Sequence, residues 1–230
     1  SHNSFANLYT SWKASLSILN LLKKPFDINQ TLINDFQEFI NLIDSTFILE
    51  VMSECDNYST SFFKEGVNID IDILNNKLVT ISKMFRRIEG LFENDRARVK
   101  IITNDKEGYY IKTTKKAYND IKDLNRCIKL DDFDCSLSCN MNEFTSTNFG
   151  ANYVKIKGHS LSTLEYEKKR VEEKIKEFLE EEYKKWCFII TNKYSGTIRD
   201  VVKIIEEIDV SVSGAIVAMK YNYTRPTIVE

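Results

Sequence analysis

VKIITNDKEGYYIKTT, residues 99–114, decides the fold of this 230-residue chain. Two runs rich in β-branched and aromatic residues, 99–103 and 108–114, flank a polar turn that ends in Gly108. This pattern predicts a β-hairpin, because such residues favour strands and glycine suits the turn between them. A third run, YVKIK at 153–157, predicts another strand. We therefore expect a small antiparallel sheet within residues 98–158.

Long segments with helical periodicity lie on both sides of this region. Apolar residues recur every three or four positions in 5–22, in 70–94, and in a helix expected to start near Asp27 or Thr31 and to run to about residue 54. The stretches 161–190 and 198–219 show the same spacing after the sheet, and the polar stretch 193–196 predicts a break between them. Ser162 and Glu165 match a capping box at the start of 161–190.

These elements predict a mainly α fold, in which a helical core and long antiparallel helices carry a small antiparallel β-rich insertion. The expected boundaries are 1–97 for the first helices, 98–158 for the insertion and 159–230 for the returning helices. The 161–190 helix has only a narrow apolar seam, so we expect it to pair with the 70–94 helix.

Composition narrows the function classes. The formal net charge is −2, but residues 98–158 contain 11 Lys and Arg against 8 Asp and Glu, which leaves this region at +3. A nucleic-acid site would therefore be a local patch in the insertion. Five irregularly spaced cysteines favour reduced thiols and an intracellular protein. The chain opens without methionine or a secretory signal, so we expect a piece of a larger protein.

Four stretches, in the same order, resemble the middle of MutS-type DNA mismatch repair proteins. They are GVNIDIDIL (66–74), KEGYYIKTT (106–114), NYVKI (152–156) followed by Leu161 and Leu164, and IDV (208–210) through to YTRP (223–226). Within the second stretch, Lys112 stands where the family usually has glutamate. The resemblance covers about residues 66–230.

The resemblance implies a lever and a clamp. In this family, two long lever helices extend from a helical core and carry a β-rich clamp that closes over the DNA backbone without reading sequence. The mismatch-reading domain and the ATPase lie elsewhere in such proteins. The chain contains no Gly-x-x-x-x-Gly-Lys-Ser/Thr motif, so we expect it to bind no cofactor and to be no enzyme itself. ATP and Mg²⁺ would be bound by the parent protein, which is expected to be an ATPase.

Asn152, Lys155 and Lys157 are the best candidates for contacts with DNA, and Asn148 and Thr147 are secondary ones. Residues 155 and 157 share one face of a strand, and amides and ammonium groups commonly donate to phosphates. Lysines that protect a solvated sheet edge would give the same pattern. The patch could extend to Lys100, Lys112, Lys115 and Lys116, but an ordinary soluble surface explains these lysines equally well.

Several other residues within the expected insertion and next to it allow more than one interpretation. Tyr109 and Tyr110 could stack on bases, although packing in the protein is the simpler interpretation. Cys127, Cys135, Cys139 and His159 match no standard zinc spacing, and a solvated acidic loop explains Asp131, Asp132 and Asp134. We expect no catalytic residues and no metal ligands.

The expected partners are the backbone of double-stranded DNA and, in the parent protein, a second MutS-type subunit in a homodimer or heterodimer. No apolar run approaches the length of a membrane span, so no membrane is expected. The expected location is intracellular and DNA-associated. The alternative function is a helical tethering or protein-interaction module whose β tip binds a protein instead of DNA.

Overall fold

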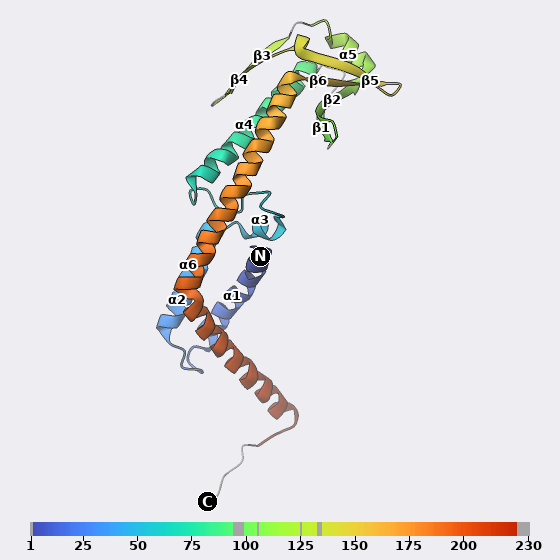
Figure 1. The fold of residues 1–230 in the computed structure, drawn as a ribbon. Coiled ribbons are helices and arrows are strands. Elements are labelled where there is room, and N and C mark those ends of the chain that lie inside the picture. Colours follow the sequence, from blue (N-terminus) through green and yellow to red (C-terminus); the bar gives the residue numbers. More distant parts are fainter. Residues whose placement is uncertain (1, 94–98, 105, 125, 133–134, 225–230) are drawn as a thin grey trace, which may run out of the picture. The chain divides into compact units, whose positions relative to one another are not determined.

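The computed structural model describes residues 2–93, 99–104, 106–124, 126–132 and 135–224, with the side chains of 130–132 and 135–138 left undescribed. The chain divides into two compact units. Figure 1 colours the chain along its sequence, from blue at the N-terminal end to red at the C-terminal end. The helical unit comprises Ser1–Asn68 and Leu179–Glu230, and the sheet unit comprises Ile69–Phe178. The longest helix, α6 (His159–Lys220), contributes its first part to the sheet unit and the rest to the helical unit.

The helical unit contains α1 (His2–Leu22), α2 (Gln30–Thr46) and α3 (Leu49–Glu54) beside the second part of α6. Its core is rich in aromatic and aliphatic side chains that are fully or almost fully buried, among them Leu19, Phe36, Phe39, Ile43, Phe47 and Phe62. The Asn29 side chain caps α2 by accepting a hydrogen bond from the Thr31 N–H.

The single helix expected from about residue 27 or 31 to 54 is wrong, since the structure divides it into α2 and α3. Phe47 and Ile48 are extended. The Ile48 N–H donates to the Phe62 carbonyl at 2.7 Å, and Phe47 forms a β-bridge with Phe63. Pairing with this distant segment fixes the backbone of the two residues, and helical periodicity could not reveal it.

The break expected at 193–196 is also wrong, because α6 is continuous through these residues. Tyr194 is buried, with its ring centroid 5.2 Å from that of Phe39. The Lys193 ammonium and the Tyr194 hydroxyl both donate to Glu38 Oε1, at 2.8 and 3.1 Å. A glycine inside a helix costs only about 1 kcal/mol relative to alanine, so the packing of Tyr194 outweighs the local signal of Gly196.

Continuity of α6 makes Gly196→Ala a stabilising change. Gly196 is exposed, and a Cβ atom built there meets nothing within 4 Å. We expect the free energy of unfolding to rise by about 0.5–1 kcal/mol, because alanine is the better helix former. Chemical denaturation followed by tryptophan fluorescence measures this change. A destabilised variant would instead indicate a break in the helix at this position.

The sheet unit begins with α4 (Ile69–Phe92), which confirms the helix expected at about 70–94, although it ends at Phe92. Its four-stranded antiparallel sheet has the order β1 (Lys100–Asn104), β2 (Gly108–Thr114), β6 (Tyr153–Gly158), β5 (Phe144–Phe149). The hairpin and the third strand are thus confirmed, as is a mainly α fold with a small antiparallel sheet inserted between helices.

The remaining elements of the sheet unit are short. They are α5 (Lys115–Ile121), the 3₁₀ turn η1 (Met141–Glu143), and a separate hairpin of β3 (Cys127–Asp132) and β4 (Cys135–Asn140). Asp131 and Asp132 lie in β3, so the acidic loop expected there is wrong for these two residues. Backbone pairing with β4 places them in a strand despite their polarity. Asp134, like Arg225 and Pro226 at the C-terminal end, lies outside the described residues.

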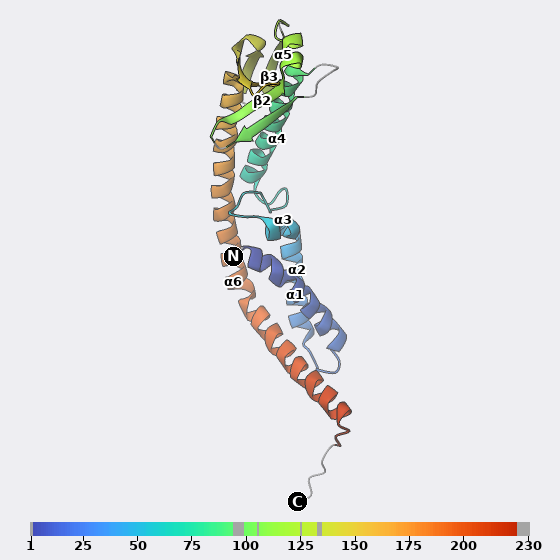
Figure 2. The same ribbon diagram turned by 90° about the vertical axis from the view of Figure 1, so that its right-hand side faces the viewer.

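One face of the four-stranded sheet is partly buried. The buried residues of this face are Ile111, Thr113, Phe144, Val154 and Ile156, whereas Ser146 and Asn148 of β5 are exposed on it. The two views agree that α4 and the first part of α6 lie side by side next to the sheet (Figures 1 and 2). The two helices run antiparallel and are joined by an ion pair between Lys77 and Glu167 at 3.8 Å. The narrow seam of α6 is buried at Leu164, Val171 and Ile175, as the expected pairing requires.

The capping box expected at Ser162 and Glu165 is not formed. The helix already starts at His159, and the Ser162 hydroxyl donates to the Gly158 carbonyl. Glu165 accepts the Tyr109 N–H of β2 at 3.1 Å instead, which fixes the helix to the hairpin. None of the helices in the described ranges is both long enough and apolar enough to cross a membrane.

Candidate nucleic-acid interface

The outer face of the sheet carries the lysines. Side chains alternate between the two faces along a strand, and residues paired across strands share a face. Lys100 pairs with Lys112, Lys112 with Lys155, and Lys155 with Thr147. Lys157 shares this face because it lies two residues beyond Lys155. We call Lys100, Lys112, Lys155 and Lys157, with the rings of Tyr110, Phe149 and Tyr153 between them, the lysine face.

Lys155 is the most enclosed of the four lysines, with only 7% of its surface exposed. Its ammonium group forms an ion pair with Glu107, in the turn between β1 and β2. The same group lies 4.4 Å from the ring centroid of Tyr110 and 5.2 Å from that of Phe149. Carboxylate and π faces together compensate the charge of a lysine that has lost most of its water.

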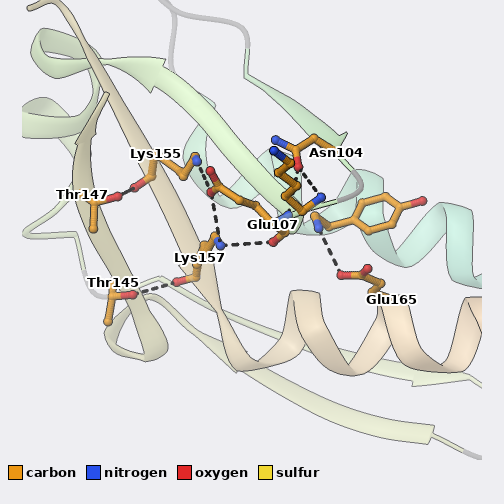
Figure 3. A network of polar contacts seen from close by, with 9 residues as sticks. Asn104, Glu107, Thr145, Thr147, Lys155, Lys157 and Glu165 are labelled. Carbon is orange, nitrogen blue, oxygen red and sulfur yellow. Dashed lines mark hydrogen bonds and ion pairs between the residues drawn. The ribbon is translucent and has the colours of Figure 1, made fainter. Parts of the chain in front are cut away.

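Lys157 reaches the same turn from a more open position, with 45% of its side chain exposed. Its ammonium group lies 3.4 Å from Glu107 Oε2 and donates to the Glu107 carbonyl oxygen at 3.1 Å (Figure 3). The hydrogen bond from Lys155, together with the charges of both lysines, holds the pKa of the Glu107 carboxyl below its usual range. Glu107 is therefore ionised at neutral pH and binds both lysines.

Lys112 rests on aromatic rings. Its ammonium group lies 4.6 Å from the ring centroid of Tyr153 and 5.1 Å from that of Phe149. Phe149 and Tyr153 are paired across β5 and β6, so the two rings stand together beside Lys112. Lys100 lies exposed on β1, at the edge of the sheet. The rings thus hold ammonium groups in place on a surface that is open to a large anion.

The structure brings together three of the five residues predicted to contact DNA. Lys155, Lys157 and Thr147 share the lysine face, and the Thr147 hydroxyl donates to the Lys155 carbonyl at 3.5 Å. Asn148 follows Thr147 on the strand and so belongs to the opposite face. Asn152 is exposed in the turn between β5 and β6, where its carbonyl oxygen accepts the Lys115 N–H at 3.0 Å.

Sequence reasoning placed Lys100 and Lys112 only as possible extensions of the patch, and it gave no role to Glu107, Phe149 or Tyr153. The spacing within single strands carries no information about which strands are neighbours. Only the register between β2 and β6 places Lys112 beside Lys155. The sequence signal that could have indicated these contacts is the pair of aromatic residues, Phe149 and Tyr153, at the two ends of the turn between β5 and β6.

The two tyrosines of β2 pack against the protein. The Tyr109 ring stacks on Phe85 of α4 with a centroid distance of 4.7 Å, and its hydroxyl accepts a hydrogen bond from Lys168 at 2.9 Å. Tyr110 is buried beneath the Lys155 ammonium. Neither ring is an open platform for a base.

Within the side chains that the structure describes, no group of three or more His, Cys, Asp or Glu residues could hold a metal ion. Cys139 is buried, and its thiol donates to Glu143 Oε1 at 3.5 Å. Burial raises the pKa of this thiol to about 12, which disfavours the thiolate form that zinc binds.

Comparison with known proteins gives a distant relationship. The chain is 24% identical over 247 aligned residues to a putative DNA mismatch repair protein, a MutS homolog of Acanthamoeba polyphaga mimivirus. The alignment covers 97% of this chain and 22% of that protein, so the chain spans about a fifth of its relative's length. No family model matches the sequence. The relationship is MutS-like and remote.

Proposed function

We propose that the chain is the lever and clamp region of a MutS-like DNA mismatch repair protein and that the lysine face contacts the backbone of double-stranded DNA. The observation that carries this proposal is the register of the sheet, which aligns Lys100, Lys112 and Lys155 in one row across three strands. The distant similarity to a viral MutS homolog, which extends over nearly the whole chain, supports it.

The chemistry of the lysine face favours phosphates over bases. Ammonium groups are point charges that bind phosphate oxygens without distinguishing sequences. The rings that could have stacked on bases lie beneath ammonium groups instead. Contacts of this kind give electrostatic, sequence-independent binding, which suits a clamp that must slide over any duplex.

The two helices next to the sheet would serve as levers. The sheet is joined to α6 through the Tyr109 N–H and Glu165, and to α4 through the Ile101 N–H, which donates to Glu89 Oε1 at 2.7 Å. Movement of the helices would therefore displace the lysine face. An ATPase domain outside this chain, with ATP and Mg²⁺, would drive that movement, in a homodimer or heterodimer of the parent protein acting on DNA inside the cell. This chain itself would have no catalytic role.

The proposal is tested by Lys100→Ala/Lys112→Ala, measured by fluorescence anisotropy with a short labelled duplex of mixed sequence. Among the described residues, Glu107 is paired with Lys155 and Lys157, so the loss of Lys100 and Lys112 removes charge without breaking that network. We expect weaker binding at low salt. The slope of log affinity against log salt should become shallower by about 2, because each lost phosphate contact contributes about 0.9.

Lys174→Ala/Lys176→Ala is the matched control, because it removes the same charge from exposed positions on α6 in the same unit. Equal affinities and slopes for the two variants would refute the proposal. They would leave the protein-interaction alternative, in which salt has little influence on the partner of the β tip.

A further inference from the structure

We propose that Glu107 is a built-in competitor of DNA phosphate, which occupies the Lys155–Lys157 pair and limits the number of phosphates that the lysine face can contact. This inference rests on the proposed function and adds a residue that sets the strength of binding. Its basis is the convergence of two lysines from β6 on a single carboxylate of the β1–β2 turn.

The carboxylate resembles a bound phosphate in its contacts. Both ammonium groups approach Oε2 of Glu107, and the Lys157 ammonium also reaches the backbone carbonyl of the same residue. A phosphate group on the lysine face would offer the same pair of lysines an anionic oxygen of similar size. The two anions would therefore compete for one position.

The chain holds Glu107 in place for this contact. Asn104 Oδ1 accepts the N–H groups of both Lys106 and Glu107, at 2.8 and 2.9 Å (Figure 3). Gly108 follows with a φ of +70°, a conformation that glycine adopts without strain, and the chain then enters β2. These hydrogen bonds hold the backbone of Glu107 in place before any ligand arrives, so the residue has little conformational freedom to lose.

Exchange with an external anion is nevertheless possible. The Glu107 side chain is 41% exposed, and Lys157 is similarly open, so a phosphate can approach the pair from solvent. Lys155 is enclosed by Tyr110 and Phe149 and cannot leave the site. DNA would displace the carboxylate, and the lysines would stay where they are.

Glu107→Gln tests the inference, because glutamine keeps the size and one oxygen acceptor but removes the charge. Glu173→Gln, at an exposed position of α6 in the same unit, makes the same change in net charge away from the sheet. With the labelled duplex at about 0.1 M salt, we expect Glu107→Gln to bind roughly five- to tenfold more tightly than Glu173→Gln. The salt slope should steepen by about 1 to 2 as one or two phosphate contacts are gained.

The gain should disappear when Glu107→Gln is combined with Lys157→Ala, because the removed carboxylate then has no exposed ammonium group to release. Glu107→Asp keeps the charge but shortens the reach, and it should show a smaller gain. Circular dichroism of each variant confirms that it is folded. If Glu107→Gln fails to fold, the Glu107→Asp result decides alone, and wild-type affinity there overturns the inference.

Affinity of Glu107→Gln equal to that of Glu173→Gln would overturn the role of Glu107. It would leave the DNA-binding face intact if Lys100→Ala/Lys112→Ala still weakens binding. Failure of the proposed function itself has a different signature, since none of the lysine or glutamate variants would then differ from its control.

Discussion

Replacing Phe39 by alanine is expected to lower the free energy of unfolding of the helical unit by about 3–5 kcal/mol. The side chain is fully buried. Its ring lies at the centre of an aromatic cluster, with centroids 5.0 Å from Trp12, 5.9 Å from Phe36 and 5.2 Å from Tyr194. Truncation removes the buried area of a phenyl ring and leaves a cavity that three rigid rings cannot fill.

The measurement is urea denaturation followed by tryptophan fluorescence. Both tryptophans of the chain, Trp12 and Trp186, belong to the helical unit, so the signal reports on this unit. Phe188→Ala is the matched control, because this phenylalanine of α6 is 71% exposed and its loss should change stability little. Similar losses for the two variants would contradict the packing described for Phe39.

Phe39 also explains why one part of the fold could not be predicted. The polar stretch 193–196 has the composition of a helix break, yet Tyr194 packs on Phe39, which lies 155 positions earlier in the chain. Local propensity is a weak signal that tertiary contacts override. The same holds for Phe47, whose extended backbone depends on its bridge to Phe63.

Helices and strands with a strong periodic pattern were predictable. The hairpin at 99–114 and the α4 helix need only local information, namely residue type, spacing and a glycine at the turn. The fold class follows from the order of these elements. Helix boundaries that depend on distant partners do not.

The candidate site was predictable in part for the same reason. Alternation along one strand places Lys155 and Lys157 together, and it could have separated Asn148 from Thr147. The neighbours of these lysines come from other strands. Glu107 lies 48 positions before Lys155, and only the register of β2 with β6 brings the turn that carries it to the pair.

Alternate residues of each strand thus lie on opposite faces of the sheet. Even a short strand such as β6 sends Val154 and Ile156 into the core and Lys155 and Lys157 to the opposite face. The position of the lysine face therefore depends on how well the inner face packs. A substitution on the inner side should disturb binding only through the fold, whereas one at Glu107 should change binding without loss of the core.

Gly158→Ala is the inner-face substitution with the sharpest expected effect. Gly158 ends β6 and pairs with Phe144 of β5. A Cβ atom at this position would lie 2.4 Å from Cδ1 of the Phe144 ring, far closer than atoms can approach. The ring cannot move aside easily, because it is buried and packs edge-on against the fully buried Phe92 at a centroid distance of 4.9 Å. We expect a loss of about 1–3 kcal/mol, the usual effect of overpacking.

Gly90→Ala supplies the matched control, since it makes the same chemical change within the sheet unit on the exposed side of α4, where a Cβ atom meets nothing within 4 Å. That variant should gain up to about 1 kcal/mol from helix propensity. Hydrogen exchange of the β2, β5 and β6 amides measures both changes within this unit: exchange should be faster in Gly158→Ala and unchanged or slower in Gly90→Ala. Unchanged protection in Gly158→Ala would mean that Phe144 can yield, and the inner face would then be less tightly packed than the position of its ring implies.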